Sequence, residues 1–99
     1  LLQSTESSSH RKGGVKVMDY QLAEELWGCV LQRKIRIPFV LEQIEISTGG
    51  AAHFYIKSSY APEHISSIFR KCGALHISTS RMSNTTRTVT VRGFNRKTA

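Results

Sequence analysis

Apolar side chains in the first third of the chain recur with the period of a helix. Four of them share one helical face at spacings of i, i+4, i+7 and i+8: Leu22, Leu26, Cys29 and Val30. Asp19 is a good N-cap for this helix, because its carboxylate can accept a hydrogen bond from the first turn. The spacing predicts a helix over 19–34. Gly28 in its middle costs about 1 kcal/mol relative to alanine, so we expect another element to pack closely there.

Apolar and polar residues then alternate, which is the period of strands. Branched and aromatic residues fill 35–47, and Pro38 confines its vicinity to a strand start or a sheet edge. The apolar parity changes within this run, so we expect a bulge or bend near Glu42. A turn at 48–51 and a second alternating run at 52–58 complete a predicted hairpin.

The second half repeats this order of helix and hairpin. Pro62 is placed at the first helical position, and Gly73 supplies the C-terminal stop. Apolar residues between them recur at i, i+3, i+4 and i+7: Ile65, Ile68, Phe69 and Cys72. Alternating runs at 75–80 and 88–92, separated by a polar turn, predict a second hairpin that ends near Phe94.

Together these elements predict a single α+β domain over residues 15–94. We expect a two-layer sandwich in helix, hairpin, helix, hairpin order, with two helices packed on a mainly antiparallel four-stranded sheet. Residues 1–14 are rich in serine and glycine, which predicts a flexible leader, and residues 95–99 form a basic C-terminal tail. A chain of 99 residues suits one core, and no apolar run approaches the roughly 20 residues that cross a bilayer.

The charge of the chain is one-sided. Fourteen Lys and Arg against 7 Asp and Glu give a formal net charge of +7. Basic and acidic residues balance in residues 1–50, and no acid follows Glu63. The whole excess therefore lies in the second half, where it attracts a polyanion such as nucleic acid.

No pattern predicts catalysis, a metal or a cofactor. Cys72 with His76 comes nearest to a metal motif, but a zinc site needs three or four ligands. Cys29 and Cys72 both fall on helix core positions, which favours free thiols in a reducing, intracellular compartment, the cytoplasm or nucleus. The N-terminus shows no signal-peptide pattern. We expect no catalytic residues, no metal ligands and no cofactor.

The candidate binding residues are basic and aromatic. If the apolar parity of the strands faces the helices, the polar parity brings imidazole, phenol and cationic groups onto the open face of the sheet. Such a face can stack bases and neutralise phosphates. The predicted nucleic-acid-binding residues are His53, Tyr55, Lys57, His76, Arg81, Arg87, Arg92, Arg96 and Lys97. Arg81 and Arg87 flank the tip of the second hairpin. We expect their joint replacement by glutamine to leave thermal stability unchanged or slightly raised while lowering affinity for a polyanion.

Two functions fit these features. The first is a non-enzymatic nucleic-acid-binding module, with RNA favoured over DNA, that uses the basic C-terminal hairpin and the sheet face. The alternative is a protein-interaction or regulatory domain of a larger chain that binds an acidic peptide, a partner protein or an anionic membrane surface. An edge strand containing Pro38 could also accept a strand from a partner. An enzyme is least expected, because no acid, base and nucleophile converge.

Overall fold

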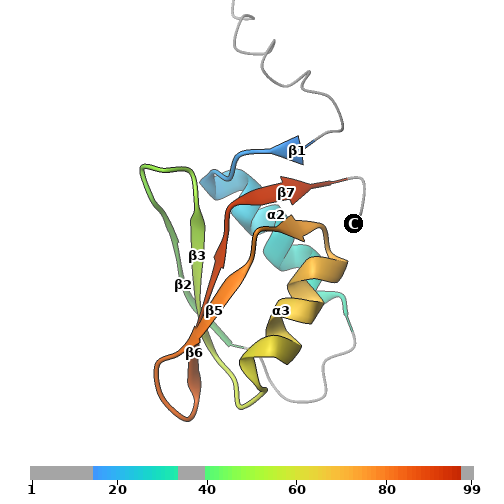
Figure 1. The fold of residues 1–99 in the computed structure, drawn as a ribbon. Helices are drawn as coiled ribbons and strands as arrows, with labels where there is room; N and C mark the ends of the chain where they lie inside the picture. Colours follow the sequence, from blue (N-terminus) through green and yellow to red (C-terminus); the bar gives the residue numbers. More distant parts are fainter. Residues whose placement is uncertain (1–14, 34–39, 97–99) are drawn as a thin grey trace, which may run out of the picture.

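The computed structural model describes residues 15–33 and 40–96 (Figure 1). The predicted leader, Pro38 and residues 97–99 lie outside these ranges. In chain order the described elements are β1 (Val15–Lys16), α2 (Tyr20–Leu31), β2 (Val40–Ile46), β3 (Ala52–Lys57), α3 (Pro62–Lys71), β4 (Ala74–Leu75), β5 (Ser78–Arg81), β6 (Thr86–Val91) and β7 (Gly93–Asn95).

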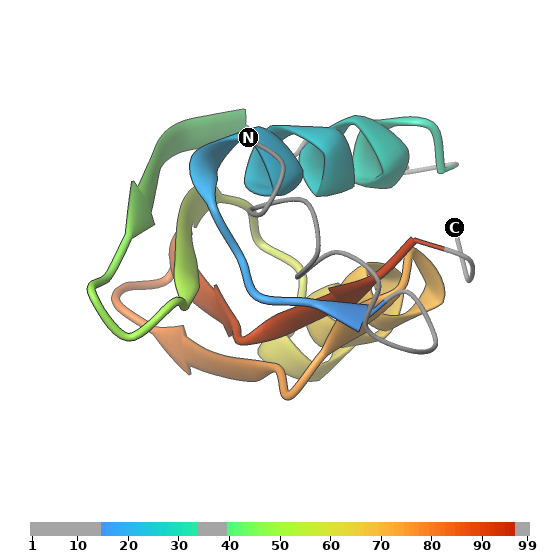
Figure 2. The ribbon, with the colours of Figure 1, turned by 90° about the horizontal axis from the view of Figure 1, so that it is seen from above.

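The larger sheet contains four antiparallel strands in the order β2-β3-β6-β5. Each predicted hairpin contributes two of them, and the β3–β6 pair joins the hairpins. In Figure 2, α2 lies over the β2 half of this sheet and α3 over the β5 half, in agreement with the contacts α2 makes with β2 and α3 makes with β5 and β6. These elements confirm the α+β class and the mainly antiparallel four-stranded sheet.

A second sheet of three short strands, in the order β1-β7-β4, was not predicted. Val15 pairs with Asn95 at one edge of β7, and Ala74 pairs with Phe94 at the other. The predicted order of helix, hairpin, helix, hairpin therefore omits the small sheet formed by β1, β7 and β4. Asn95, the first residue of the predicted C-terminal tail, belongs instead to a strand.

His76 divides the run that was predicted as a single strand. Its φ of 53° lies in the left-handed region, which few residues other than glycine adopt. Leu75 before it pairs with β7 of the small sheet, whereas Ser78 after it pairs with β6 of the large sheet. The alternation of apolar and polar residues continues through this point, so the pattern gives no sign of the change of sheet.

Both helices begin where their sequences predict. Asp19 caps α2, with its Oδ1 accepting a hydrogen bond from the Leu22 backbone N–H at 2.8 Å. Pro62 is the first residue of α3. Gly73 follows the end of α3 with a φ of 101°, and a Cβ there would collide with the Asn95 carbonyl oxygen. Gly73 thus ends the helix and lets β7 approach it.

The predicted bulge is present in β2. The register with β3 shifts between Leu41 and Gln43, so that Glu42 is the extra residue. Leu41 lies opposite Ile56, and Ile44 lies opposite Phe54. The bulge therefore keeps apolar residues of both parities on the helix side of the sheet.

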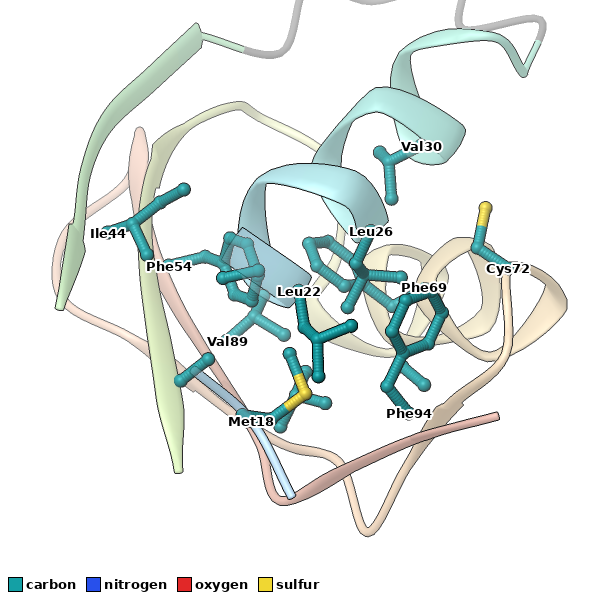
Figure 3. Packing of buried hydrophobic residues seen from close by; sticks show 14 of the residues in the cluster. Met18, Leu22, Leu26, Val30, Ile44, Phe54, Phe69, Cys72, Val89 and Phe94 are labelled. Carbon is teal, nitrogen blue, oxygen red and sulfur yellow. The ribbon is translucent and has the colours of Figure 1, made fainter. Parts of the chain in front are cut away.

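The hydrophobic core lies between the large sheet and the two helices (Figure 3). Phe54 of β3 and Phe69 of α3 are fully buried and meet edge to face, with ring centroids 5.1 Å apart. Trp27 of α2 stacks on Phe54 at 6.2 Å. The expectation of close packing at Gly28 was wrong, because a Cβ there would meet nothing within 4 Å. Within residues 15–33 and 40–96, no helix combines the length and apolar character needed to cross a membrane.

Candidate functional site

The outer face of β3 carries three of the predicted site residues. His53, Tyr55 and Lys57 share the parity opposite to the buried Phe54 and Ile56. Their partners across the sheet on β6 are threonines: Thr90, Thr88 and Thr86. The His53 Nδ1 and the Thr90 Oγ1 lie 3.0 Å apart, within hydrogen-bond distance. The sheet thus brings His53, Tyr55 and Lys57 together.

Carboxylates reduce the positive charge of this face. The Tyr55 hydroxyl donates a hydrogen bond of 2.8 Å to Glu45, and this bond raises the pKa of Tyr55. The Lys57 Nζ lies 3.8 Å from a carboxylate oxygen of Glu42. Both acids come from the neighbouring strand β2. The position of β2 beside β3 was predicted, but the presence of its acids on this face was not. The named charges on this face are one lysine and two glutamates, so the face is not cationic.

Arg87 flanks the β5–β6 turn opposite Arg81, as predicted, but its side chain is buried, with 1% of its surface exposed, and is not available for binding. Its Nε donates to the Tyr60 carbonyl oxygen at 2.9 Å, and its two terminal nitrogens donate to the backbone oxygens of Ser83, Thr86 and Asn84 at 2.7, 3.2 and 3.2 Å. Burial lowers the pKa of Arg87. The burial of Arg87 could have been predicted from the alternation along the strand, because Arg87 shares the parity of Val89 and Val91. Its role is to bind the β5–β6 turn to the loop before α3.

His76 and Arg92 lie outside the strands to which they were assigned. His76 is exposed at the bend between β4 and β5, and Arg92 is exposed between β6 and β7. The backbone N–H of Arg92 donates to the Leu75 carbonyl oxygen at 3.2 Å, so both segments change sheets at the same level. The two side chains thus belong to the bend and not to the open face of the large sheet.

The remaining predicted cations differ in their surroundings. Arg81 is exposed at the end of β5. The Arg96 Nε donates to Glu25 at 2.8 Å, and about half of each side chain remains accessible to solvent, with exposures of 50% and 41%. Lys97 lies outside the described residues.

A basic groove between the helices was not predicted from the sequence. It has a volume of about 440 Å3 and is lined by Gln32, Arg33, His64, Ile68 and Lys71. Three of these residues occupy one face of α3 at i, i+4 and i+7, while Gln32 and Arg33 follow the end of α2. None of the described residues that line this basic groove is acidic. The helical spacing of the three α3 residues could have been recognised in the sequence. The approach of Arg33 to them could not, because it depends on tertiary packing.

Two contacts give the basic groove its form. The Arg33 Nη2 donates to the Lys71 carbonyl oxygen at 2.9 Å and so ties the end of α2 to the end of α3. At the other end of the basic groove, the His64 ring stacks on Tyr60 with centroids 4.3 Å apart and planes inclined by 15°. The basic groove therefore combines the held Arg33 guanidinium and the exposed Lys71 with an exposed imidazole ring.

The two cysteines lie beside Arg33. Cys72 is fully buried and Cys29 half-buried, and both are free thiols. Burial and the neighbouring Cys72 thiol raise the pKa of Cys29 to about 11, which keeps this thiol protonated and a weak nucleophile at neutral pH. Hydrogen bonding to Cys72 raises the pKa of Arg33. Within the described part of the chain, no three His, Cys, Asp or Glu side chains gather in a way that could hold a metal ion.

Comparison with known proteins adds no relative. No protein-family model, no curated protein and no solved structure matches this chain.

Proposed function

We propose that the protein is a non-enzymatic nucleic-acid-binding module, with RNA favoured over DNA, and that the basic groove is its phosphate-binding centre. The observation that carries the proposal is the composition of the basic groove, which contains Arg33, Lys71 and His64 but no acid among its described lining residues. Arg33 hydrogen-bonds the Lys71 carbonyl and Cys72, and the rest of its five N–H donors remain for a phosphate. Arginine suits this role because its planar fork can bind two phosphate oxygens.

The preference for single-stranded RNA rests on the size of the basic groove and on its aromatic end. A volume of about 440 Å3 falls within the range of small-ligand sites and suits unpaired nucleotides rather than a duplex. His64, held against Tyr60, presents a ring on which an unpaired base can stack. Ile68 supplies an apolar floor between this ring and the cations.

The other exposed cations would extend the phosphate path and strengthen the long-range field. Arg70, Arg81 and Arg92 are all exposed and follow Glu63, the last acid of the chain. Arg96 is paired with Glu25, but an ion pair at such exposure is worth at most about 1 kcal/mol, so a phosphate can compete for it. On the sheet face, His53, Tyr55 and Lys57 have a secondary part in this proposal because Glu42 and Glu45 lie among them.

The test is the binding of a labelled single-stranded uridine oligomer, followed by fluorescence anisotropy across a salt series. Each neutralised phosphate contributes about 0.7 to the slope of log affinity against log salt. The variant Arg33→Gln with Lys71→Gln should therefore lower affinity and reduce the slope by about 1.4, since two contacts are lost. The matched control, Arg81→Gln with Arg92→Gln, removes the same charge elsewhere and should have the smaller effect.

Two results would overturn the proposal. Absence of RNA binding at low salt would exclude the function. Equal losses in the two double variants would leave the net charge, not the basic groove, as the source of affinity. An acidic peptide and vesicles of anionic lipid are titrated in parallel. Binding of either one without RNA binding would favour the alternative of a protein-interaction or membrane-surface domain over the nucleic-acid module.

A further inference from the structure

A second groove, of about 310 Å3, lies between α2 and β2 and differs in charge from the basic groove. We name it the edge groove. From α2 it is lined by Tyr20, Glu24, Trp27 and Gly28, and from β2 by Leu41, Glu42, Gln43 and Ile44. The four helical residues recur at i, i+4, i+7 and i+8, which is one face of α2.

The edge groove runs along the backbone of an edge strand. β2 is the terminal strand of the large sheet, and among the described elements it pairs only with β3. The bulge at Glu42 interrupts the alternation of side chains, so that four consecutive residues of this edge strand line one groove. The unpaired N–H and C=O groups of such an edge can accept a strand from a partner.

The floor of the edge groove is apolar and open. Gly28 faces empty space, since a Cβ built there would meet nothing within 4 Å. Trp27 beside it is held against Phe54 of the core. Tyr20 at the rim and Val40 at the start of β2 are large apolar residues that each remain 52% exposed. This floor has room for a bulky apolar side chain.

The charges of the edge groove select the occupant. Glu24 and Glu42 are its charged lining residues within the described chain. The contact of Glu42 with Lys57 is 3.8 Å long and solvent-exposed, so it competes weakly with a better-placed cation. A second copy would present the same two acids, Glu24 and Glu42, to this edge groove, and repulsion between like charges opposes pairing between copies.

We propose that the edge groove binds an extended cationic peptide segment of a partner protein. The peptide backbone pairs with the free edge of β2, a bulky apolar side chain sits over Gly28 against Trp27, and lysine or arginine side chains face Glu24 and Glu42. This interaction is independent of RNA binding, because the edge groove and the basic groove have different lining residues and opposite charge.

Trp27 provides the readout, since it is the only tryptophan of the chain. The full chain is titrated with an acetylated peptide in which lysines alternate with valines around a central leucine, and Trp27 fluorescence is recorded. We expect a saturable change. A peptide with glutamate in place of each lysine should bind at least about tenfold more weakly. Equal binding of the two peptides would overturn the charge assignment.

Two pairs of variants locate the peptide. Gly28→Leu fills the floor and should weaken binding about tenfold, whereas Gly28→Ala leaves most of the space and should bind nearly as the parent does. Glu24→Gln with Glu42→Gln should weaken binding by a similar factor. Glu63→Gln, an exposed acid on α3 outside the edge groove, is its control and should have no effect.

Several outcomes would contradict the proposal. One is unchanged affinity in the Glu24 and Glu42 variant, which decides the question even if Gly28→Leu does not fold. Another is amide chemical-shift changes confined to residues outside α2 and β2. A third is fluorescence that depends on protein concentration without peptide, because that result would assign the edge groove to a second copy of the chain.

Discussion

Arg87 of β6 lies directly opposite Arg81 of β5, yet Arg87 is buried and Arg81 is exposed. Residues opposite each other in an antiparallel pair share one face of the sheet. The charge of Arg81 adds to the effect of burial in lowering the pKa of Arg87. Arg87 nevertheless holds four hydrogen bonds to backbone oxygens, and these define it as a structural residue.

Replacement of these two arginines should therefore have different consequences. Arg87→Gln should lower the free energy of unfolding by about 2 to 3 kcal/mol, because the bonds from a charged donor are lost and the turn carbonyls lose their partner. Arg81→Gln should change it by less than about 0.5 kcal/mol, with a gain favoured because a like charge is removed. Urea denaturation of the two single variants measures this difference. Equal stability would contradict the structural role of Arg87 and restore the expectation that both arginines are dispensable for the fold.

Gly28→Ala should stabilise the protein. The position is inside α2, and an added Cβ meets nothing within 4 Å, so alanine gains helix propensity without a clash. We expect an increase in the free energy of unfolding of about 0.5 to 1 kcal/mol. Thermal denaturation followed by circular dichroism tests this gain, and a lowered midpoint would contradict it.

Phe69→Ala should be the most damaging of these substitutions. The ring is fully buried and contacts Phe54 edge to face and Trp27 at 6.2 Å. Its removal leaves a cavity between α3 and the sheet and should cost about 3 to 5 kcal/mol, a large fraction of the stability of a small domain. Phe69→Leu is the control, since it keeps most of the volume. If the two variants have the same urea midpoint, the cavity is not the cause of the lost stability.

The raised pKa of Cys29 predicts a loss of stability in alkali. An unfolded cysteine releases its proton near its ordinary pKa of 9.0, whereas the folded thiol keeps its proton until about pH 11. Between these values the native state binds more protons than the unfolded state, so stability falls as pH rises through this window and is unaffected below it. The urea midpoint of the parent, relative to that of Cys29→Ala, should decline from pH 9 to pH 11. A constant difference would contradict the shift.

Local patterns were sufficient for those parts of the fold that depend on neighbouring residues. The cap at Asp19, the start of α3 at Pro62 and the bulge at Glu42 each follow from chemistry within a few positions. The burial of Arg87 was also accessible, because it shares the parity of Val89, but its charge was given more weight than its position. The strand parity of Arg87 favours burial, whereas its charge favours exposure. Burial prevails here because backbone carbonyl oxygens are available to accept its hydrogen bonds.

Features that join distant segments were not accessible in the same way. The basic groove requires Arg33 to approach Lys71, and the acids of β2 modify the sheet face only through the register with β3. The change of sheet at His76 depends on one backbone torsion angle in a run whose alternation is otherwise regular. A periodic pattern describes the faces of an element but not which neighbour each face meets.

The pairing of β1 with β7 joins Val15 to Asn95, two residues near opposite ends of the described chain. During synthesis on a ribosome, β1 emerges early, while its partner emerges only after both helices and all four strands of the large sheet have been made. The backbone groups of β1 that pair with β7 must therefore remain without these partners until translation of the domain is almost finished. Because contacts between distant residues form slowly, this pairing should be the last step of cotranslational folding, and ribosome-bound chains truncated before Gly93 should leave Val15 and Lys16 open to hydrogen exchange.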